Sequence, residues 1–224
     1  MVELKNAKPI VFNTAEAAYL AGYVSAAVSK SGTVSAYGGM QIPSVNIFMD
    51  GFADGIAKYN EDSGKTVKLI GWDKDAQNGS FVGNFEDQSK GKQLTEQQIS
   101  QGSDIVMPVA GPVGKGTLSA AEGKNVLVVG VDSDWAEMYP DSSSMILTSV
   151  VKKIDQAVFD TVKEARDGKF TSEAYVGDLE NQGVDIAPFH DLDAQVTAEI
   201  KDKVKSLKED IIAGKIKVES KNNP

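Results

Sequence analysis

The feature that most constrains this fold is a short apolar run at residues 126–131 that stops abruptly at Asp132, Ser133, Asp134 and Trp135. A run of this length ending in acids is typical of a buried parallel strand, because such strands are covered on both faces. Open α/β sheets bind ligands beyond the carboxyl ends of their strands. Asp132 is therefore our first candidate for a ligand contact, the alternative being a solvated residue at the end of a strand.

A lysine takes a comparable position further along the chain. Residues 148–152 lead from a second apolar run into a predicted helix, so that Lys152 is expected at the start of that helix, where the first turn otherwise presents only backbone donors. A carboxylate at Asp132 and an ammonium at Lys152 together suit a polyhydroxyl ligand, since they offer both acceptors and donors of hydrogen bonds. Here too, a solvated end residue is the alternative.

Strand and helix patterns alternate through the first two thirds of the chain. We predict strands at residues 9–12, 33–37, 67–71, 105–109 and 126–131, with helical patterns between them. This alternation is typical of βαβ units, so the predicted fold class is α/β with a doubly wound parallel sheet. Asn13 and Glu16 have the spacing of a capping box at the first helix.

The final third is less regular. The patterns predict a helix at 151–166, strands at 174–176 and 184–187 around a turn at 180–183, and a helix at 194–213 with one apolar stripe. We divide the chain into a ligand-binding α/β lobe at 7–148, a hinge with returning helices and strands at 149–218, and a mobile tail at 219–224.

Composition and charge exclude several classes of partner. The chain has 224 residues, a formal net charge of -9 and no cysteine. The acidic balance disfavours nucleic acid and anionic lipid, and the lack of cysteine excludes disulfides, thiolate metal sites and cysteine nucleophiles. No apolar stretch approaches the ~20 residues of a membrane helix, and residues 1–6 lack the apolar core of a secretory signal.

The glycine-rich turn at residues 110–116 is the nearest approach to a cofactor motif. Its spacing differs from that of a P-loop and from that of a dinucleotide-binding turn. Two interpretations remain: a tight connection, or a turn whose bare backbone at Ala110 and Gly111 approaches a neutral ligand. We expect no cofactor.

Catalytic and metal motifs are missing as well. Residues 73–79 resemble a calcium loop, but the glycine is one place late and no glutamate closes the loop. His190 is the only histidine and lies just before a helix, where Asp191 and Asp193 are better placed as caps than as orienters of a base. The sequence therefore predicts binding without turnover, with no catalytic residue and no metal.

Several short motifs occur in order along the chain. They are residues 12–22, Gly38-Gly39-Met40, Pro43, Gly51-Phe52, Gly79-Ser80-Phe81, Lys90-Gly91-Lys92, Gly130-Val131-Asp132, Thr148-Ser149-Val150-Val151-Lys152 and Leu192-Asp193. Taken together, they resemble the basic membrane protein family, the purine-nucleoside receptors of ABC importers that are similar to the PnrA lipoproteins. The resemblance extends from about residue 8 to about residue 218.

This resemblance implies one lobe of a type I periplasmic-binding-protein-like fold. The two-lobed receptor would close on a purine nucleoside (inosine, guanosine or adenosine) and hand it to an ABC permease with its ATPase. The family's ribose-binding aspartate and lysine fall on Asp132 and Lys152, and its ligand-approaching loop falls on Ala110 and Gly111. Met107 or Val109 lies near a position where the family can present an aromatic side chain, and this chain has none there.

The resemblance also sets expectations about location and assembly. Family members begin with a lipidated cysteine and an entire first lobe with an Asp-Ser-Phe-Asn type motif, none of which this chain contains. We therefore expect half of the cleft to lie outside this chain. The implied location is extracytoplasmic, at the cell surface or in the periplasm, with membrane attachment only through the lipid anchor of the full-length member.

Self-association is a further expectation. In the family, material after Thr148 is expected to pack on the first lobe. Without that lobe it would expose an apolar stripe, and such stripes drive association.

Two other functions share this kind of fold. The first is the sensor half of a transcription regulator, which needs a helix-turn-helix and a basic face. The second is a nucleoside- or sugar-processing α/β enzyme.

Overall fold

A six-stranded sheet forms the centre of the computed structural model, which describes residues 4–224. The strand order is β10-β8-β7-β6-β2-β3, and β10 at one edge is the antiparallel member. The strands are β2 (Thr33–Gly38), β3 (Lys68–Ile70), β6 (Ile105–Val109), β7 (Leu127–Asp132), β8 (Ile146–Lys152) and β10 (Val184–Ile186). The predicted doubly wound α/β class is confirmed.

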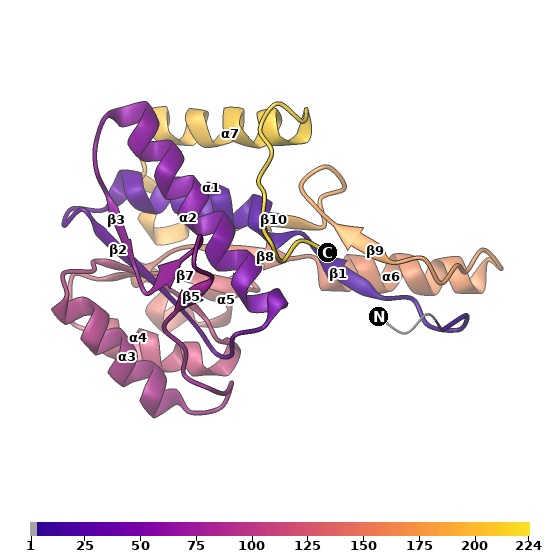
Figure 1. Cartoon of the computed structure of the whole chain (residues 1–224), viewed down its shortest axis with the longest axis horizontal. Coiled ribbons are helices and arrows are strands. Elements are labelled where there is room, and N and C mark those ends of the chain that lie inside the picture. Colours follow the sequence, from indigo (N-terminus) through magenta and orange to yellow (C-terminus); the bar gives the residue numbers. More distant parts are fainter. Residues whose placement is uncertain (1–3) are drawn as a thin grey trace.

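Helices cover both faces of this sheet (Figure 1). On one face lie α1 (Thr14–Val28) and α2 (Pro43–Ser63), with α7 (Ala198–Ile212) outside them. The other face carries α3 (Gln88–Ser100) and α4 (Gly114–Ala121). The α1 and α2 backbones approach closely, because a Cβ at Gly55 would collide with the Tyr19 carbonyl oxygen and a Cβ at Gly22 with that of Phe52. The small residues of both helices permit this contact.

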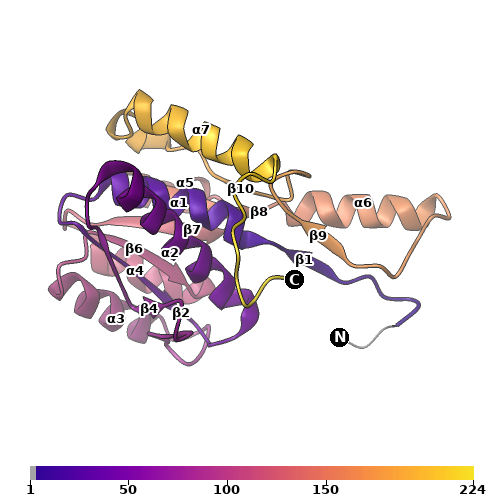
Figure 2. The ribbon, with the colours of Figure 1, turned by 45° about the horizontal axis from the view of Figure 1, so that its top comes forward.

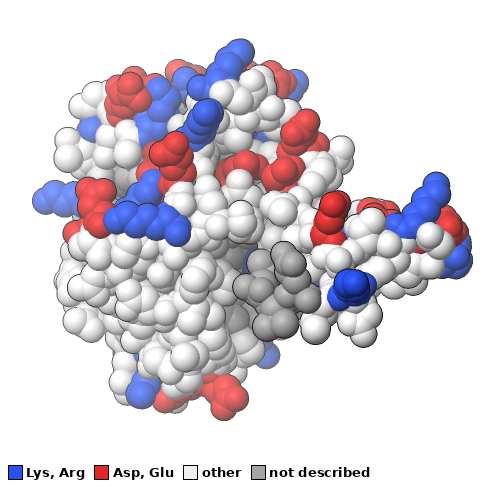
Figure 3. Space-filling view, turned by 45° about the vertical axis from the view of Figure 1, so that its right-hand side comes forward, with Lys and Arg blue, Asp and Glu red and all other residues white. Residues whose placement is uncertain are grey.

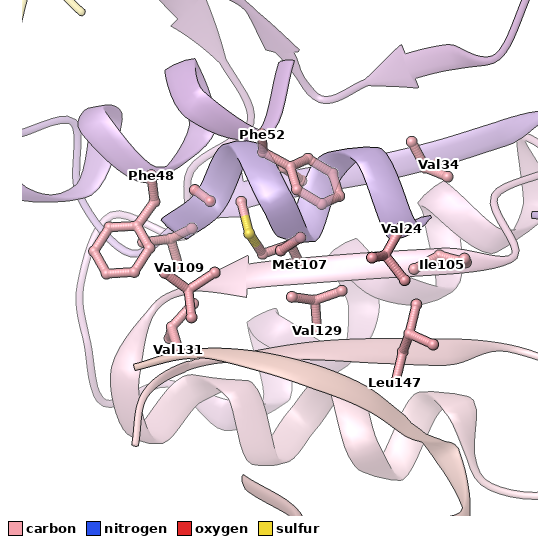
Figure 4. Packing of buried hydrophobic residues seen from close by; sticks show 14 of the residues in the cluster. Val24, Val34, Phe48, Phe52, Ile105, Met107, Val109, Val129, Val131 and Leu147 are labelled. Carbon is pink, nitrogen blue, oxygen red and sulfur yellow. The ribbon is translucent and has the colours of Figure 1, made fainter. Parts of the chain in front are cut away.

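The core lies between the sheet and the pair α1 and α2 (Figure 4). Phe48 and Phe52 of α2 point toward the sheet, and Met107 and Val109 of β6 meet them. These four side chains are almost completely buried. The apolar β6 and β7 runs are therefore interior strands, as their sequence predicts.

An arm extends from this lobe (Figures 1 and 2). It consists of β1 (Ile10–Phe12), β9 (Tyr175–Gly177) and α6 (Ile154–Arg166), with β1 and β9 paired in parallel. An ion pair of 2.6 Å between Lys8 Nζ and Glu164 Oε2 joins the segment before β1 to α6. Several apolar side chains of α6 are open to solvent, and Phe159 and Val162 are each 62% exposed.

Several sequence predictions require correction. The strand predicted at 9–12 belongs to the arm and not to the main sheet, because its partner is β9. The two strands predicted around the turn at 180–183 do not pair with each other, since β9 pairs with β1 while β10 pairs with β8. At the first helix Asn13 is the N-cap, but its amide donates to Glu16 Oε1 and makes no side-chain cap, whereas Glu16 Oε2 accepts from the Leu179 backbone.

The remaining elements are short and lie near strand ends. They are β4 (Trp72–Asp73), β5 (Asn78–Gly79), α5 (Trp135–Met138) and the 3-10 turns η1 (Gly111–Val113), η2 (Pro140–Met145) and η3 (His190–Gln195). The helix predicted from residue 194 begins only at Ala198, after η3. The tail predicted as mobile is bonded to α2 through Ser220 and Asn222.

Candidate functional site

Two of the predicted site residues end neighbouring strands at one edge of the sheet. Asp132 is the last residue of β7, and Lys152 is the last residue of β8. Because β7 and β8 run in parallel, their carboxyl ends meet, and Asp132 is paired in register with Val151. The Lys152 Nζ atom lies 2.8 Å from Asp132 Oδ1. The structure therefore brings together the carboxylate and the ammonium that the sequence selected separately.

Asp132 has an unusual backbone conformation. Its φ angle is +69°, in the left-handed region that most residues avoid and that aspartate tolerates better than most. The next residue folds back, since the Ser133 backbone N–H donates to the Val131 carbonyl over 2.8 Å. This turn directs the carboxylate out of the strand, and the side chain stays 44% exposed. Asp132 can therefore accept hydrogen bonds from a ligand.

Lys152 is held from two sides. Besides the Asp132 carboxylate, its ammonium faces the Phe48 ring at 4.9 Å from the centroid, which is a cation–π contact. The side chain is only 19% exposed. The prediction that Lys152 begins a helix is wrong, because β8 extends through Lys152 and α6 begins at Ile154. The strand continues because Lys152 pairs with Val184 of β10.

A hollow of about 290 Å³ lies on one side of the ion pair. Its lining residues come from the turn after β6, the first turn of α4, the end of β7, and α5 with the residue that follows it. They are Gly111, Pro112, Lys115, Val131, Asp132, Ser133, Trp135, Met138 and Tyr139. The predicted ligand-approaching turn therefore meets Asp132 here, with Gly111 at a φ of +53° that favours glycine.

Aromatic groups form the floor and rim of this first hollow. The Trp135 ring is buried and meets Tyr139 edge to face at 5.6 Å, and Lys115 Nζ lies 5.6 Å from the Tyr139 ring centroid. Burial raises the pKa of the Tyr139 phenol above its ordinary value. The Trp135 N–H groups are both used inside the protein, by Ser149 Oγ and by the Val131 carbonyl.

A second hollow, of about 300 Å³, lies on the Lys152 side. It is bounded by β1, by the first turns of α1 and α2, and by the end of the chain. Its lining residues are Ile10, Val11, Phe12, Thr14, Pro43, Ser44, Ile47, Lys152, Asn222, Asn223 and Pro224. Asp132 lines the first hollow and Lys152 the second, so their ion pair stands between the two.

Two predicted site residues have no exposed side chain. Met107 is completely buried in the core between β6 and α2 (Figure 4), so this side chain does not reach either hollow. Ala110 is also fully buried, and only its backbone is near the turn that lines the first hollow. The expectation that Met107 contacts a ligand is therefore not supported, because strand alternation turns its side chain into the core.

The acid that His190 contacts is Asp134, which is distant from it in the sequence. Its Nε2 lies 2.7 Å from Asp134 Oδ2, and this contact joins η3 to the residue that caps α5. Within residues 4–224, no group of three or more His, Cys, Asp or Glu side chains lies close enough to hold a metal ion. No helix in this described part of the chain has the length and apolar character to cross a membrane.

Sequence reasoning missed Phe48 and the C-terminal residues as neighbours of Lys152. Phe48 lies on a predicted helix, but no local pattern indicates that its ring faces a lysine 104 positions later. Tyr139 was also missed. A signal for it existed, because it follows shortly after the acids and tryptophan that end the β7 run.

Comparison with known proteins identifies the family. The description "ABC transporter substrate-binding protein PnrA-like" applies to a family that matches residues 2–222. This chain belongs to that family. The family consists of substrate-binding proteins and not of enzymes. The resemblance seen in the ordered motifs is thereby confirmed.

Two curated relatives show how much of such a protein the chain represents. The "ABC transporter nucleoside-binding protein BmpA" of Lactococcus lactis subsp. cremoris (strain MG1363) is 34% identical over 232 residues, which cover 97% of this chain and 61% of that protein. "Basic membrane protein D" of Borreliella burgdorferi (strain JD1) is 31% identical over 162 residues, covering 71% of this chain and 43% of that protein. The chain therefore spans less than two thirds of the length of each of these relatives.

Solved structures share the fold. A solute-binding protein of an ABC transporter system from Aeropyrum pernix K1 aligns with a TM-score of 0.81 at 24% identity, over 96% of this chain and 67% of that one. A "Transcriptional Activator of comK gene" from Bacillus halodurans aligns with a TM-score of 0.80 at 20% identity, over 96% and 68%. At these identities the likeness establishes only the fold, a lobe of the type I periplasmic-binding-protein kind.

Proposed function

We propose that this chain is the C-terminal portion of the solute-binding component of an ABC importer and binds purine nucleosides. The observation that carries the proposal is the Asp132–Lys152 pair at the carboxyl edge of the sheet, with a separation of 2.8 Å. Open α/β sheets bind ligands at this edge. Family membership and the nucleoside-binding name of the Lactococcus lactis relative support the same ligand class.

The chemistry of the pair fits the ribose part of a nucleoside. The Asp132 carboxylate has room for further acceptor contacts, because its side chain is 44% exposed. Two vicinal hydroxyls can donate to a carboxylate, while an ammonium such as that of Lys152 donates to a hydroxyl oxygen. Hydrogen bonds to charged groups are shorter and stronger than neutral ones. We therefore assign Asp132 and Lys152 to the ribose hydroxyls.

The backbone at Ala110 and Gly111 completes this proposed half-site. Gly111 and Asp132 line the same hollow, so a ligand held by Asp132 would lie near the turn. In the view of Figure 3, the middle of the lobe face beside the arm shows few charged side chains, whereas charged side chains lie along its upper part, at its lower edge and on the arm. A weakly charged face suits a neutral ligand and a second lobe that closes over it.

The further steps of the proposal follow from the family. The complete receptor would close its two lobes on the nucleoside and deliver it to a permease driven by an ATPase, outside the cytoplasm and anchored by lipid. No chemical change of the ligand is part of this function.

Incubation with inosine tests the proposal against its enzymatic rival. The full chain is mixed with inosine, binding is followed by the chemical shifts of the protein, and the solution is then analysed for products. A receptor binds inosine and leaves it unchanged. Release of hypoxanthine would show a nucleosidase, and the absence of any shift with inosine, guanosine and adenosine would refute purine-nucleoside binding.

A further inference from the structure

Asp50 is a fully buried carboxylate on α2 that takes no part in the proposed ribose contacts. Burial of an ionised carboxylate is costly unless hydrogen bonds replace its water. Four donors do so here. Trp72 Nε1 (3.0 Å) and Gln77 Nε2 (2.8 Å) donate to Oδ1, while Ser220 Oγ (2.5 Å) and Asn222 Nδ2 (3.0 Å) donate to Oδ2.

Half of these donors belong to the C-terminal segment, residues 219–224. The segment is tied down at further points: Lys74 Nζ donates to the Glu219 carbonyl at 2.7 Å, Lys221 Nζ to the Asp75 carbonyl at 3.0 Å, and Asn222 Nδ2 also to Gln77 Oε1 at 2.8 Å. All of these contacts join the segment to α2 or to the β4 and β5 hairpin region. Asp50 is the fully buried residue at the centre of this group of hydrogen bonds.

The C-terminal segment also borders the candidate site. Asn222, Asn223 and Pro224 line the hollow that contains Lys152. The remaining lining residues of that hollow, apart from Lys152, lie on β1 and near the starts of α1 and α2. Figures 1 and 2 both show the chain end beside β1. The C-terminal segment therefore forms one wall of the hollow. The hydrogen bonds from Ser220 and Asn222 to Asp50 hold the segment in this position.

We propose that Asp50 is a positioning residue for the ligand site and acts through the C-terminal segment. By holding Ser220 and Asn222, it keeps residues 222–224 against the hollow beside Lys152, so that a nucleoside bound at the ion pair meets a closed wall on that side. This inference rests on the proposed function. It predicts that loosening the segment weakens nucleoside binding although none of the bonds to Asp50 involves Asp132 or Lys152.

The test compares two variants of the full chain with the wild type. The double variant Ser220→Ala, Asn222→Ala removes both tail donors, and Ser220→Thr is the matched control that keeps a hydroxyl. Hydrogen exchange reads the protection of residues 213–224, and the Trp72 indole N–H resonance reads the bonding at Asp50. Inosine affinity is measured by chemical-shift titration, and thermal unfolding reports the integrity of the lobe.

In the double variant, we expect the amides of the C-terminal segment to exchange at least tenfold faster than in the wild type and the Trp72 indole resonance to shift. The variant should bind inosine at least threefold more weakly than the wild type and should retain a cooperative thermal transition. Ser220→Thr should behave as the wild type. Unprotected tail amides in the wild type would overturn the anchoring, and a loosened tail with unchanged inosine affinity would overturn the positioning role.

A third variant covers the case in which the double variant does not fold. Removal of residues 223–224 shortens the wall and leaves every donor to Asp50 in place. This truncation should weaken inosine binding while the Trp72 indole resonance stays unchanged. Unchanged inosine affinity would refute the proposal that the end of the chain forms a wall of the ligand site. If the wild type binds no purine nucleoside, the proposed function and the positioning role both fail, whereas exchange and the indole resonance still decide the anchoring.

Discussion

Replacement of Asp132 by alanine is the most direct perturbation of the proposed ribose site. The side chain lies at the surface end of β7, 44% exposed, with one carboxylate oxygen 2.8 Å from Lys152 Nζ. Its loss removes no core contact. In a receptor in which a first lobe closes over this one, we expect Asp132→Ala to weaken purine-nucleoside binding while the fold remains.

The expected loss of nucleoside affinity depends on what the Asp132 carboxylate contacts before the ligand binds. The ion pair with Lys152 already exists without ligand. Its Asp132 end is open to solvent, and solvent-screened pairs contribute only about 0–1 kcal/mol. The ligand's hydroxyls replace water on the exposed carboxylate, and hydrogen bonds to charged groups contribute about 1.5–3 kcal/mol. The dissociation constant should therefore rise about 10-fold to 150-fold, which calorimetry resolves.

The positive φ of Asp132 supplies a control for the backbone. At +69° alanine is strained by about 1–2 kcal/mol, whereas glycine adopts the angle freely. Asp132→Gly should therefore unfold a few degrees, about 2–4 °C per kcal/mol for a chain of this size, above Asp132→Ala. Both variants lack the carboxylate, so both should lose the same nucleoside affinity.

The comparison separates side chain from backbone. If Asp132→Gly binds like the wild type while Asp132→Ala does not, the turn conformation and not the carboxylate carries the affinity. If both variants bind like the wild type, Asp132 does not contact the ligand and the ribose assignment is refuted. The melting temperatures of the two variants, measured by calorimetry or circular dichroism, show whether the left-handed geometry is present.

Three further predictions concern the rest of the molecule. Lys152→Met should weaken nucleoside binding and keep a cooperative thermal transition, since methionine is an unbranched apolar side chain that suits the position beside Phe48; loss of that transition would make the lysine structural. The apolar α6 surface, with Phe159 and Val162 exposed, should cause self-association that Phe159→Glu abolishes; a strictly monomeric wild type in light scattering would contradict this. The chain alone should bind inosine with a dissociation constant of about 1 mM or weaker, because one lobe cannot enclose the ligand, and micromolar binding in a titration would refute the half-cleft interpretation.

Local pattern determined most of the fold and part of the site. The apolar runs that became β6 and β7 are long enough and continuous enough to specify buried parallel strands, and the acids that follow β7 specify where the chain meets solvent. The rule that ligands bind at the carboxyl edge then selects Asp132. Lys152 was found for the wrong local reason, as a helix start, although its place at the same edge was right.

Tertiary structure alone decided which segments became neighbours. The run at 9–12 reads as one more strand of the sheet, yet its partner is β9, about 165 residues later, because pairing depends on contacts that no local period encodes. Met107 belongs to the same strand as the predicted loop but faces the core, since alternation and the packing of α2 fix its side. The tail 219–224 is polar in sequence and would be mobile if solvated. It is ordered because the folded lobe places the buried Asp50 within reach of Ser220 and Asn222, so that desolvation of one carboxylate, 170 positions away from Ser220, determines the path of the chain end.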